Sequence, residues 1–465
     1  MQALKEHNLP SVEAHGIDFV PLTERYGTPY RLFTIWFSTN LSIITVAAGT
    51  LSVSAGLGFA WAVTGIAIGN AIGTIFMAAH SAQGPHLGVP QMIQSRAQFG
   101  VLGAGLPLLA VVVTYLLGSA ADSVIARGIL VILAPLGGNE ALLLFGVVSL
   151  LIAFVGYQLI HIVGAIVTFT SGALFLLAAC ILLLRGTGSS ISMSGTAMHF
   201  SRTVFALTIT QAAAWSLSFG PYVADYSRYL PENVSDAKTF WYTGAGCFLG
   251  STLMMILGAY IAWISPDLAR DVGSTVANIF GSGRAIAQVV LVVGMLLTNV
   301  MNVYSAYMST VSILSGIKRM EKVGNARKFV LMTLLTATVT LIASLVQDHF
   351  QAYFADVLNA MLYLLVPWSA INLADYYLVR NGHYNINDLF RIEGVYGAYR
   401  WKTIGVYILS IVAQEPFMSL SFYSGAVGRR LGVDVAWIPG LIVPTVLYVL
   451  VERRTRRKKY REFTS

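Results

Sequence analysis

The chain has 465 residues, of which 56% are hydrophobic and only 11% are charged. A soluble domain carries roughly 25% charged residues, so this composition, with a mean hydropathy of +0.70, excludes an ordinary soluble enzyme. The formal net charge of +8 does not indicate a nucleic-acid partner, because basic residues beside anionic membrane lipid act as topology signals. We therefore expect an all-α integral membrane protein.

Apolar stretches long enough to cross a hydrocarbon core of about 30 Å recur along the whole chain. They predict about twelve transmembrane helices, near residues 32–57, 60–82, 99–133, 141–158, 161–184, 203–224, 239–264, 284–316, 329–347, 357–378, 403–424 and 437–451. The first 31 residues have no apolar region of the kind found in signal peptides. Cys180 and Cys247 both fall inside predicted spans, which argues against a disulfide framework.

Lysine and arginine are distributed unevenly between the two sides of these spans. With the N-terminus in the cytoplasm, most of the 29 basic residues fall in cytoplasmic segments, including the loop KRMEKVGNARK and the tail ERRTRRKKYR. The positive-inside rule then predicts that both termini are cytoplasmic. We expect a multi-pass protein of a bacterial inner membrane, in contact with membrane lipid.

Signatures of several enzyme classes are missing. The patterns GxxxxGK[ST], GxSxG and HExxH do not occur, and the eight histidines are scattered. We expect no enzymatic activity, no metal site and no cofactor. One alternative stays open, namely a non-transporting membrane protein whose polar residues only join helices to one another.

Polar residues inside two of the spans indicate a cavity. Asp122 lies in the third span, one turn after Gly118, and charge at this depth is expensive unless it faces a cavity or a partner. The eighth span holds Thr298, Asn299 and Asn302. The two amides are three residues apart and share a helix face, where they could read the edge of a planar heterocycle. The alternative is a hydrogen-bond clamp between helices, worth about 1 kcal/mol.

Two spans carry signs of interruption. In the sixth, WSLSFGPYVADYSRYLP, Gly220 and Pro221 interrupt the apolar helix. The first span combines polar residues with Gly49, a natural break. Discontinuous helices near the bilayer midplane are typical of secondary transporters. Asp225 and Arg228 follow at the cytoplasmic end of the sixth span, where we expect them to organise an inner gate.

The chain resembles the nucleobase–cation symporter-1 family, in its purine–cytosine permease branch. The resemblance is carried by WFSTN at 36–40, QMIQSRAQFG at 91–100, GPYVADYSRYLP at 220–231, TNVMNVYS at 298–305 and INLADYYLVRNGHYNINDLF at 371–390. It implies a leucine-transporter-type fold with two inverted five-helix repeats, at 32–185 and 203–379, and two more helices at 403–451. Residues 1–31 and the basic tail 452–465 would then be cytoplasmic.

The resemblance implies a substrate site on the first, third, sixth and eighth helices. A family aromatic position falls at Gly118 and an amide position at Asp122, and the stacking aromatic of the sixth helix is Trp215 or Phe219. The implied substrate residues are Asn40, Ser42, Gly118, Asp122, Trp215, Ser216, Ser218, Phe219, Thr298, Asn299 and Asn302. The implied hinge and gate residues are Gly49, Gly220, Pro221, Asp225 and Arg228.

Two positions depart from the family pattern. Gly118 removes one face of the usual aromatic sandwich and leaves space for a bulkier ring. Asp122 offers a carboxylate to a ring N–H or to a cationic heterocycle. Arg127 is the alternative partner of Asp122, but five residues along a helix separate two side chains by about 140°, so we expect Asp122 to face the cavity.

The family resemblance also implies import driven by Na⁺ or H⁺. A sodium site in this fold would need hydroxyls upstream of the eighth-helix amides, and the stretch Val289–Leu296 has none. Asp122 is a protonatable group in apolar surroundings, so H⁺ is favoured over Na⁺. The expected substrate is a nucleobase or related small heterocycle, with hydantoin-like or allantoin-like ureides and vitamin precursors as alternatives. The sequence makes no prediction about the oligomeric state.

Overall fold

The computed structural model describes residues 17–186, 198–264, 272–317, 324–347 and 350–464. Residues 1–16 of the predicted N-terminal segment, and the side chains of the basic tail after residue 453, lie outside this description. Within it, every regular element is a helix, apart from a β-bridge between Ser419 and Ser424.

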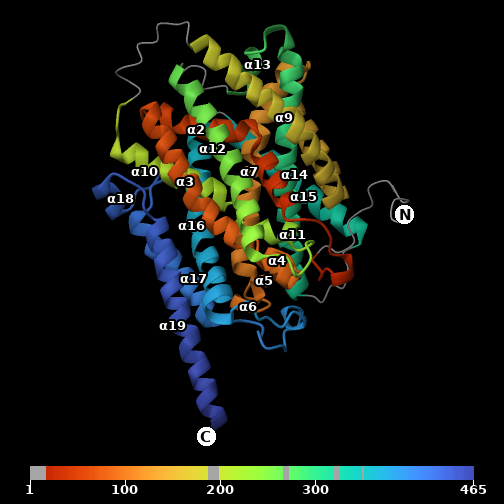
Figure 1. Cartoon of the computed structure of the whole chain (residues 1–465), viewed down its shortest axis with the longest axis vertical. Helices are drawn as coiled ribbons and strands as arrows, with labels where there is room; N and C mark the ends of the chain where they lie inside the picture. The colour runs from red at the N-terminus through yellow and green to blue at the C-terminus, as the bar shows by residue number, and fades with distance from the viewer. Residues whose placement is uncertain (1–16, 187–197, 265–271, 318–323, 348–349, 465) are drawn as a thin grey trace.

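The helices divide into an N-terminal and a C-terminal series (Figure 1). The first series contains α1 (Tyr30–Asn40), α2 (Ile43–Ser54), α3 (Phe59–Ala79), α4 (Gln83–Leu87), α5 (Gln91–Gln94), α6 (Arg96–Phe99), α7 (Gly105–Leu133), α8 (Gly138–Val155) and α9 (Tyr157–Gly186). The second contains α10 (Arg202–Leu217), η2 (Gly220–Tyr222), α11 (Val223–Ser227), α12 (Asp236–Ile264), α13 (Val272–Asn278), α14 (Arg284–Ile317), α15 (Asn325–Val346), α16 (Phe350–Leu373), the π-helix η6 (Ala374–Arg380), α17 (Trp401–Gln414), α18 (Ala426–Leu431) and α19 (Trp437–Thr464).

Eight helices of the described chain are long and apolar enough to cross a membrane, or nine if the bent pair α1 and α2 forms one span. The all-α membrane fold is therefore confirmed, whereas the predicted count of twelve spans is not. Three predicted spans fall outside this set. They correspond to α10, with 16 residues, to α17, with 14 residues, and to α19, which continues into the charged tail.

Helix contacts define two groups of helices. In the first group, α3 packs along α10 and α12, and α12 packs along α1 and α2. In the second group, α7, α8, α9, α14 and α15 pack on one another. Helix α16 lies between the two groups, because it packs on α7 and equally on α10. Figure 1 shows the same arrangement, with α2, α3 and α12 beside each other and α7, α14 and α15 beside each other. The polar residues predicted at the substrate site come from both groups.

The first span is broken, but not at the predicted glycine. The chain bends by 61° between α1 and α2, where Leu41 and the extended Ser42 separate the two helices. Gly49 lies inside α2, and a Cβ built on it would lie 1.9 Å from the carbonyl oxygen of Met255 on α12. The expectation that Gly49 is the break is therefore wrong. This glycine is needed for close helix packing, as small residues are at membrane helix interfaces.

The sixth span is broken where the sequence predicts it. Helix α10 ends at Leu217, a 3-10 turn covers Gly220–Tyr222, and α11 begins at Val223. Pro221 lies in the first turn of this 3-10 segment, where its missing N–H leaves no helical hydrogen bond unmade. The two interruptions lie near each other, since Trp215 Nε1 near the end of α10 donates to Asn40 Oδ1 at the end of α1 at 2.8 Å.

Candidate substrate site

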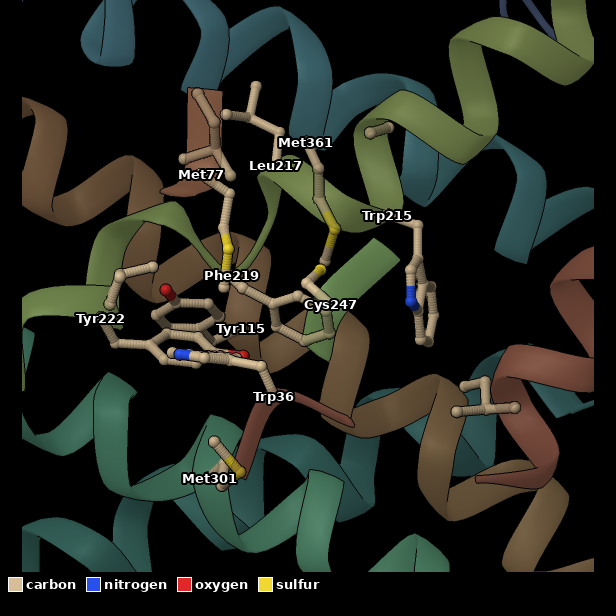
Figure 2. Packing of buried hydrophobic residues seen from close by; sticks show 14 of the residues in the cluster. Trp36, Met77, Tyr115, Trp215, Leu217, Phe219, Tyr222, Cys247, Met301 and Met361 are labelled. Atoms are coloured by element: carbon tan, nitrogen blue, oxygen red, sulfur yellow. The ribbon is translucent and has the colours of Figure 1, made fainter. Parts of the chain in front are cut away.

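A cluster of aromatic side chains lies where the two broken helices meet α7. The rings of Trp36 on α1 and Tyr222 are stacked with their centroids 5.7 Å apart, and Phe219 lies 5.7 Å from Trp36. Tyr115 on α7 contacts Tyr222 at 5.2 Å. Figure 2 shows these rings gathered around Phe219, with Trp215 at the edge of the group. The cluster supplies flat apolar surfaces of the kind that stack on a heterocycle.

Sequence reasoning named neither Trp36 nor Tyr115 as a site residue. The signal for Tyr115 is its spacing, because it precedes Asp122 by seven residues and so shares a helix face with it. Trp36 belongs to the WFSTN motif, four residues before Asn40. Of the two predicted stacking residues, Phe219 contacts Trp36, Trp215 and Tyr222.

The polar centre of the site joins α7 to α14. The Asn302 side-chain nitrogen donates to Asp122 Oδ2 at 3.3 Å, and the buried Asp122 Oδ1 has no hydrogen-bond donor among the described residues. A Cβ at Gly118 would lie 3.6 Å from Asn302 Nδ2 and 3.2 Å from Met361 Cε on α16. The structure thus brings Gly118, Asp122 and Asn302 together. It also fills the space beside Gly118 with Met361, where the sequence predicted room for a larger ring.

Arg127 does not pair with Asp122. Its guanidinium packs against Gly138 at the start of α8, where a Cβ would lie 2.4 Å from one of its nitrogens. The carboxylate of Asp122 therefore faces Asn302 and not Arg127. This agrees with the angle of about 140° between Asp122 and Arg127 around α7.

The two amides of α14 reach different neighbours. Asn299 Nδ2 donates to Ser149 Oγ on α8 at 2.7 Å, while its buried Oδ1 has no donor among the described residues. Thr298 Oγ1 donates to the backbone oxygen of Thr39 at 3.3 Å. Asn302 is therefore the amide next to Asp122, and Asn299 contributes one open acceptor and a contact between helices.

Several predicted substrate residues are bonded to one another inside the first helix group. Trp215 Nε1 donates to Asn40 Oδ1 at 2.8 Å, and Asn40 Nδ2 donates to the backbone oxygen of Trp36 at 2.8 Å. Ser216 Oγ donates to Asn70 Oδ1 on α3 at 2.9 Å, and Ser218 Oγ donates to the backbone oxygen of Trp215 at 2.7 Å. These bonds hold the ends of the two broken helices in place behind the aromatic cluster.

A second set of polar atoms surrounds the break between α1 and α2. The hydroxyls of Ser42, Thr45 and Ser171 are buried without a hydrogen-bond partner among the described residues. A Cβ at Gly294 on α14 would lie 3.0 Å from Ser171 Oγ on α9 and 3.2 Å from the Leu41 carbonyl oxygen. Sequence reasoning looked for hydroxyls on α14 and missed Ser171, which faces the break from another helix.

The predicted gate residues, Asp225 and Arg228, lie on and directly after α11, on the C-terminal side of the break in the sixth span. Asp225 Oδ1 accepts a hydrogen bond from the backbone N–H of Gln91 at 2.8 Å, and Arg228 donates to the backbone oxygen of Asp18 at 3.2 Å. Both side chains are buried. They connect α11 to the short helices after α3 and to the N-terminal segment.

Two broken helices that enclose a buried carboxylate, an amide and a group of aromatic rings define a membrane transporter for a small molecule. A family model described as "Permease for cytosine/purines, uracil, thiamine, allantoin" matches residues 19–440. The chain belongs to this family, whose members are permeases and not enzymes.

Individual relatives agree with this assignment. The chain is 39% identical over 449 residues to "Putative purine-cytosine permease YxlA" of Bacillus subtilis (strain 168), covering 96% of this chain and 97% of that one. It is 25% identical over 395 residues to the purine-cytosine permease fcyB of Emericella nidulans, covering 80% and 74% of the two chains.

Among solved structures, the fold matches Mhp1, a nucleobase-cation-symport-1 family transporter in a closed conformation with bromovinylhydantoin bound. The TM-score is 0.75 over 96% of this chain and 97% of that chain, at 19% sequence identity. This similarity supports the fold.

Proposed function

We propose that the protein imports a nucleobase or a related small heterocycle by cation symport through alternating access. The observation that carries this proposal is the buried Asp122, hydrogen-bonded to the partly buried Asn302 beside the aromatic cluster. A carboxylate accepts a hydrogen bond from a ring N–H, and an amide side chain both donates and accepts hydrogen bonds. The aromatic rings stack on the heterocycle. The purine-cytosine permeases among the relatives support the same substrate class.

The structure supports dividing the predicted site residues by role. In this proposal Asp122, Asn302 and Phe219 contact the substrate, with Gly118 and the open acceptor of Asn299 at its edge. The residues that are hydrogen-bonded within the first helix group do not contact the substrate in this proposal. They hold the contacting residues in position. The positioning residues are Asn40, Trp215, Ser216 and Ser218, and Thr298 plays the same part on α14.

We propose H⁺ as the coupling ion, carried by Asp122. Its carboxylate has one oxygen bonded to Asn302 and one oxygen open, so that a substrate N–H and a proton would compete for the same group. Na⁺ is a second candidate because of the oxygen atoms around the α1–α2 break. The Leu41 carbonyl and the hydroxyls of Ser42, Thr45 and Ser171 are hard ligands of the type that alkali cations prefer.

The excess of basic residues supports an orientation with both termini in the cytoplasm of a bacterial cell. On the proposed inner side lie the buried Arg96 and Arg228 and the partly buried Arg380. The Bacillus relative supports a bacterial plasma membrane as the location. The apolar outer surfaces of α8, α9 and α15 would then contact lipid.

Ligand screening followed by counterflow tests the proposed function. Purified protein is heated with cytosine, adenine, hypoxanthine, uracil, hydantoin, allantoin or pyridoxine, and the compounds that raise the melting temperature are labelled. We expect a nucleobase to give the largest rise and to exchange across the membrane of proteoliposomes. A larger rise with a ureide or a vitamin precursor would identify that class instead. Binding without exchange would contradict transport.

A further inference from the structure

A buried histidine connects the first helix group to the bridging helix α16 at the proposed cytoplasmic end. His80 is the residue that follows α3, in the first group. Its Nε2 lies 2.9 Å from Ser369 Oγ, and its Nδ1 lies 3.1 Å from Asn372 Oδ1, both on α16, the helix that bridges the two groups. The imidazole ring also stacks on Trp368 of α16, with centroids 5.0 Å apart and an angle of 14° between the planes.

Amide side chains extend this contact. Gln83 Nε2 on α4 donates to the same Asn372 Oδ1 at 2.9 Å, and Gln91 Nε2 on α5 donates to Gln83 Oε1 at 2.9 Å. One turn further along, Tyr377 OH donates to the backbone oxygen of Ala79 at 2.8 Å. We call His80, Gln83, Gln91, Ser369 and Asn372 the amide–histidine clamp.

The hydrogen bonds of the clamp are shielded from water. Each of the five side chains of the clamp is at most 1% exposed. A hydrogen bond in such surroundings is stronger than one in water, and separating its partners without water would leave polar groups unpaired. The clamp can therefore open only when water enters between the end of α3 and α16, which is the event that opens a transporter to one side.

The position of the clamp between the first helix group and the bridging helix α16 suggests when that event occurs. In folds with broken helices, one group of helices rocks against the other around a fixed substrate site. Bonds inside a group, such as Ser216 to Asn70, can persist through this movement. Helix α16 packs on α7 as well as on α10, so bonds between α3 or α4 and α16 break when α16 follows α7 away from the first group.

We propose that the amide–histidine clamp is the cytoplasmic gate of the transport cycle. It is closed in this structure and separates when the ligand is released into the cytoplasm. This inference rests on the proposed transport function and on the proposed orientation, and it assigns to His80, Gln83 and Asn372 a role separate from substrate binding.

Cross-linking tests the gate. In the variant Gln83→Cys/Asn372→Cys, a short thiol-reactive cross-linker should join α4 to α16 and hold the clamp closed. We expect counterflow to fall to background and to return after reductive cleavage of the linker, while the ligand still raises the melting temperature of the cross-linked protein. Full counterflow by protein with a completed cross-link would overturn the proposal.

A matched control joins two helices of the same group at nearly the same depth. A Cβ at Gly244 on α12 would lie 3.5 Å from Ala78 Cβ on α3, a separation that a disulfide can bridge. The variant Ala78→Cys/Gly244→Cys should keep its counterflow when it is oxidised. Loss of counterflow in both cross-linked variants would show that any restraint on α3 is inhibitory, and it would count against a specific gate.

A thiol-labelling experiment measures opening of the gate in the absence of substrate. The thiol of Gln83→Cys is labelled by a charged maleimide applied from the cytoplasmic side, with and without Asn372→Ala. We expect the second substitution to speed labelling about fivefold, as the loss of one hydrogen bond would predict, with the melting temperature retained. Unchanged labelling would overturn the gate. Absence of counterflow by the parent protein, together with faster labelling, would instead count against the proposed function alone.

Discussion

Gly118 and Asp122 are the two residues at which the family resemblance implies a different side chain. They lie one turn apart on α7, and both face Asn302 on α14. Asp122 supplies charge where an amide is implied, and Gly118 supplies space where an aromatic ring is implied. The side chain that takes up this space is Met361 on α16. Substrate size should therefore depend on residues 118 and 361 together.

A larger residue at position 118 should weaken ligand binding. In Gly118→Leu the new side chain must displace Met361 Cε, 3.2 Å from the Cβ position, and then approaches Asn302. We expect Kd to rise about tenfold, which corresponds to about 1.4 kcal/mol and lies within the usual cost of overpacking. Gly118→Ala should change Kd much less, because the unbranched Met361 side chain can move.

Combining two substitutions supplies the control. Met361→Ala frees the volume that Gly118→Leu needs, so the double variant should bind more tightly than Gly118→Leu alone. Kd is measured for the parent, the two single variants and the double variant by titration calorimetry in detergent. Independent, additive effects of the two substitutions would contradict a shared space.

At this scale the sequence predicted some contacts and missed others. Asp122, Gly118 and Asn302 could be chosen because charge and amides are costly in an apolar span. The sequence did not predict that Met361 lies beside them, because that depends on how helices distant along the chain are packed. Tyr115 is different, because its spacing from Asp122 on α7 already places it on the same helix face. Asn40 and Ser216 were chosen for the same polarity, but their partners, Trp215 and Asn70, lie within the first helix group.

At the scale of single helices, the two interruptions have different causes. Pro221 marks the break of the sixth span in the sequence, because proline removes a helical hydrogen bond. The break of the first span lies at Leu41 and Ser42, which carry no proline or glycine signal. The glycine that the sequence indicates as the break, Gly49, lies inside α2. A helix glycine required for close packing looks the same in a single sequence as a glycine required for a bend.

Gly49→Val should destabilise the protein. The valine side chain would overlap the backbone of α12, since even a Cβ at this position lies 1.9 Å from the Met255 oxygen. We expect a loss of about 3 kcal/mol or more, at the upper end of overpacking costs, seen as a lower melting temperature. Gly405→Ala on α17 is the matched control, because nothing lies within 4 Å of its Cβ position. Equal melting temperatures for the two variants would contradict the packing role.

Pro221→Ala should affect the rate of transport more than ligand binding. Alanine removes a penalty of about 3 kcal/mol against a continuous helix, so α10 and α11 can straighten and the movement at the break becomes less favourable. We expect the maximal counterflow rate to fall about tenfold with a much smaller change in Kd. Equal changes in rate and Kd would show that Pro221 shapes the site without acting as a hinge.

For the whole molecule, composition alone predicted the class of fold, because long apolar segments in lipid can satisfy their backbone only as helices or closed barrels. The number of spans was harder to predict. Segments such as α10 and α17 are short helices that continue into irregular turns, and an apolar window does not separate them from full spans. The division into two helix groups depends on contacts between distant helices, for example α3 with α10 and α7 with α14.

Proton-driven accumulation tests the central claim most directly. Proteoliposomes free of sodium are given an inward step of one pH unit, and uptake of the labelled nucleobase is compared for the parent protein and Asp122→Asn. Coupling to one proton supports about tenfold accumulation, because a pH unit corresponds to about 1.4 kcal/mol. We predict that the parent accumulates ligand and that Asp122→Asn only equilibrates it, while counterflow persists in both. Accumulation by Asp122→Asn equal to that of the parent, or a strict sodium requirement in the parent, would contradict the account.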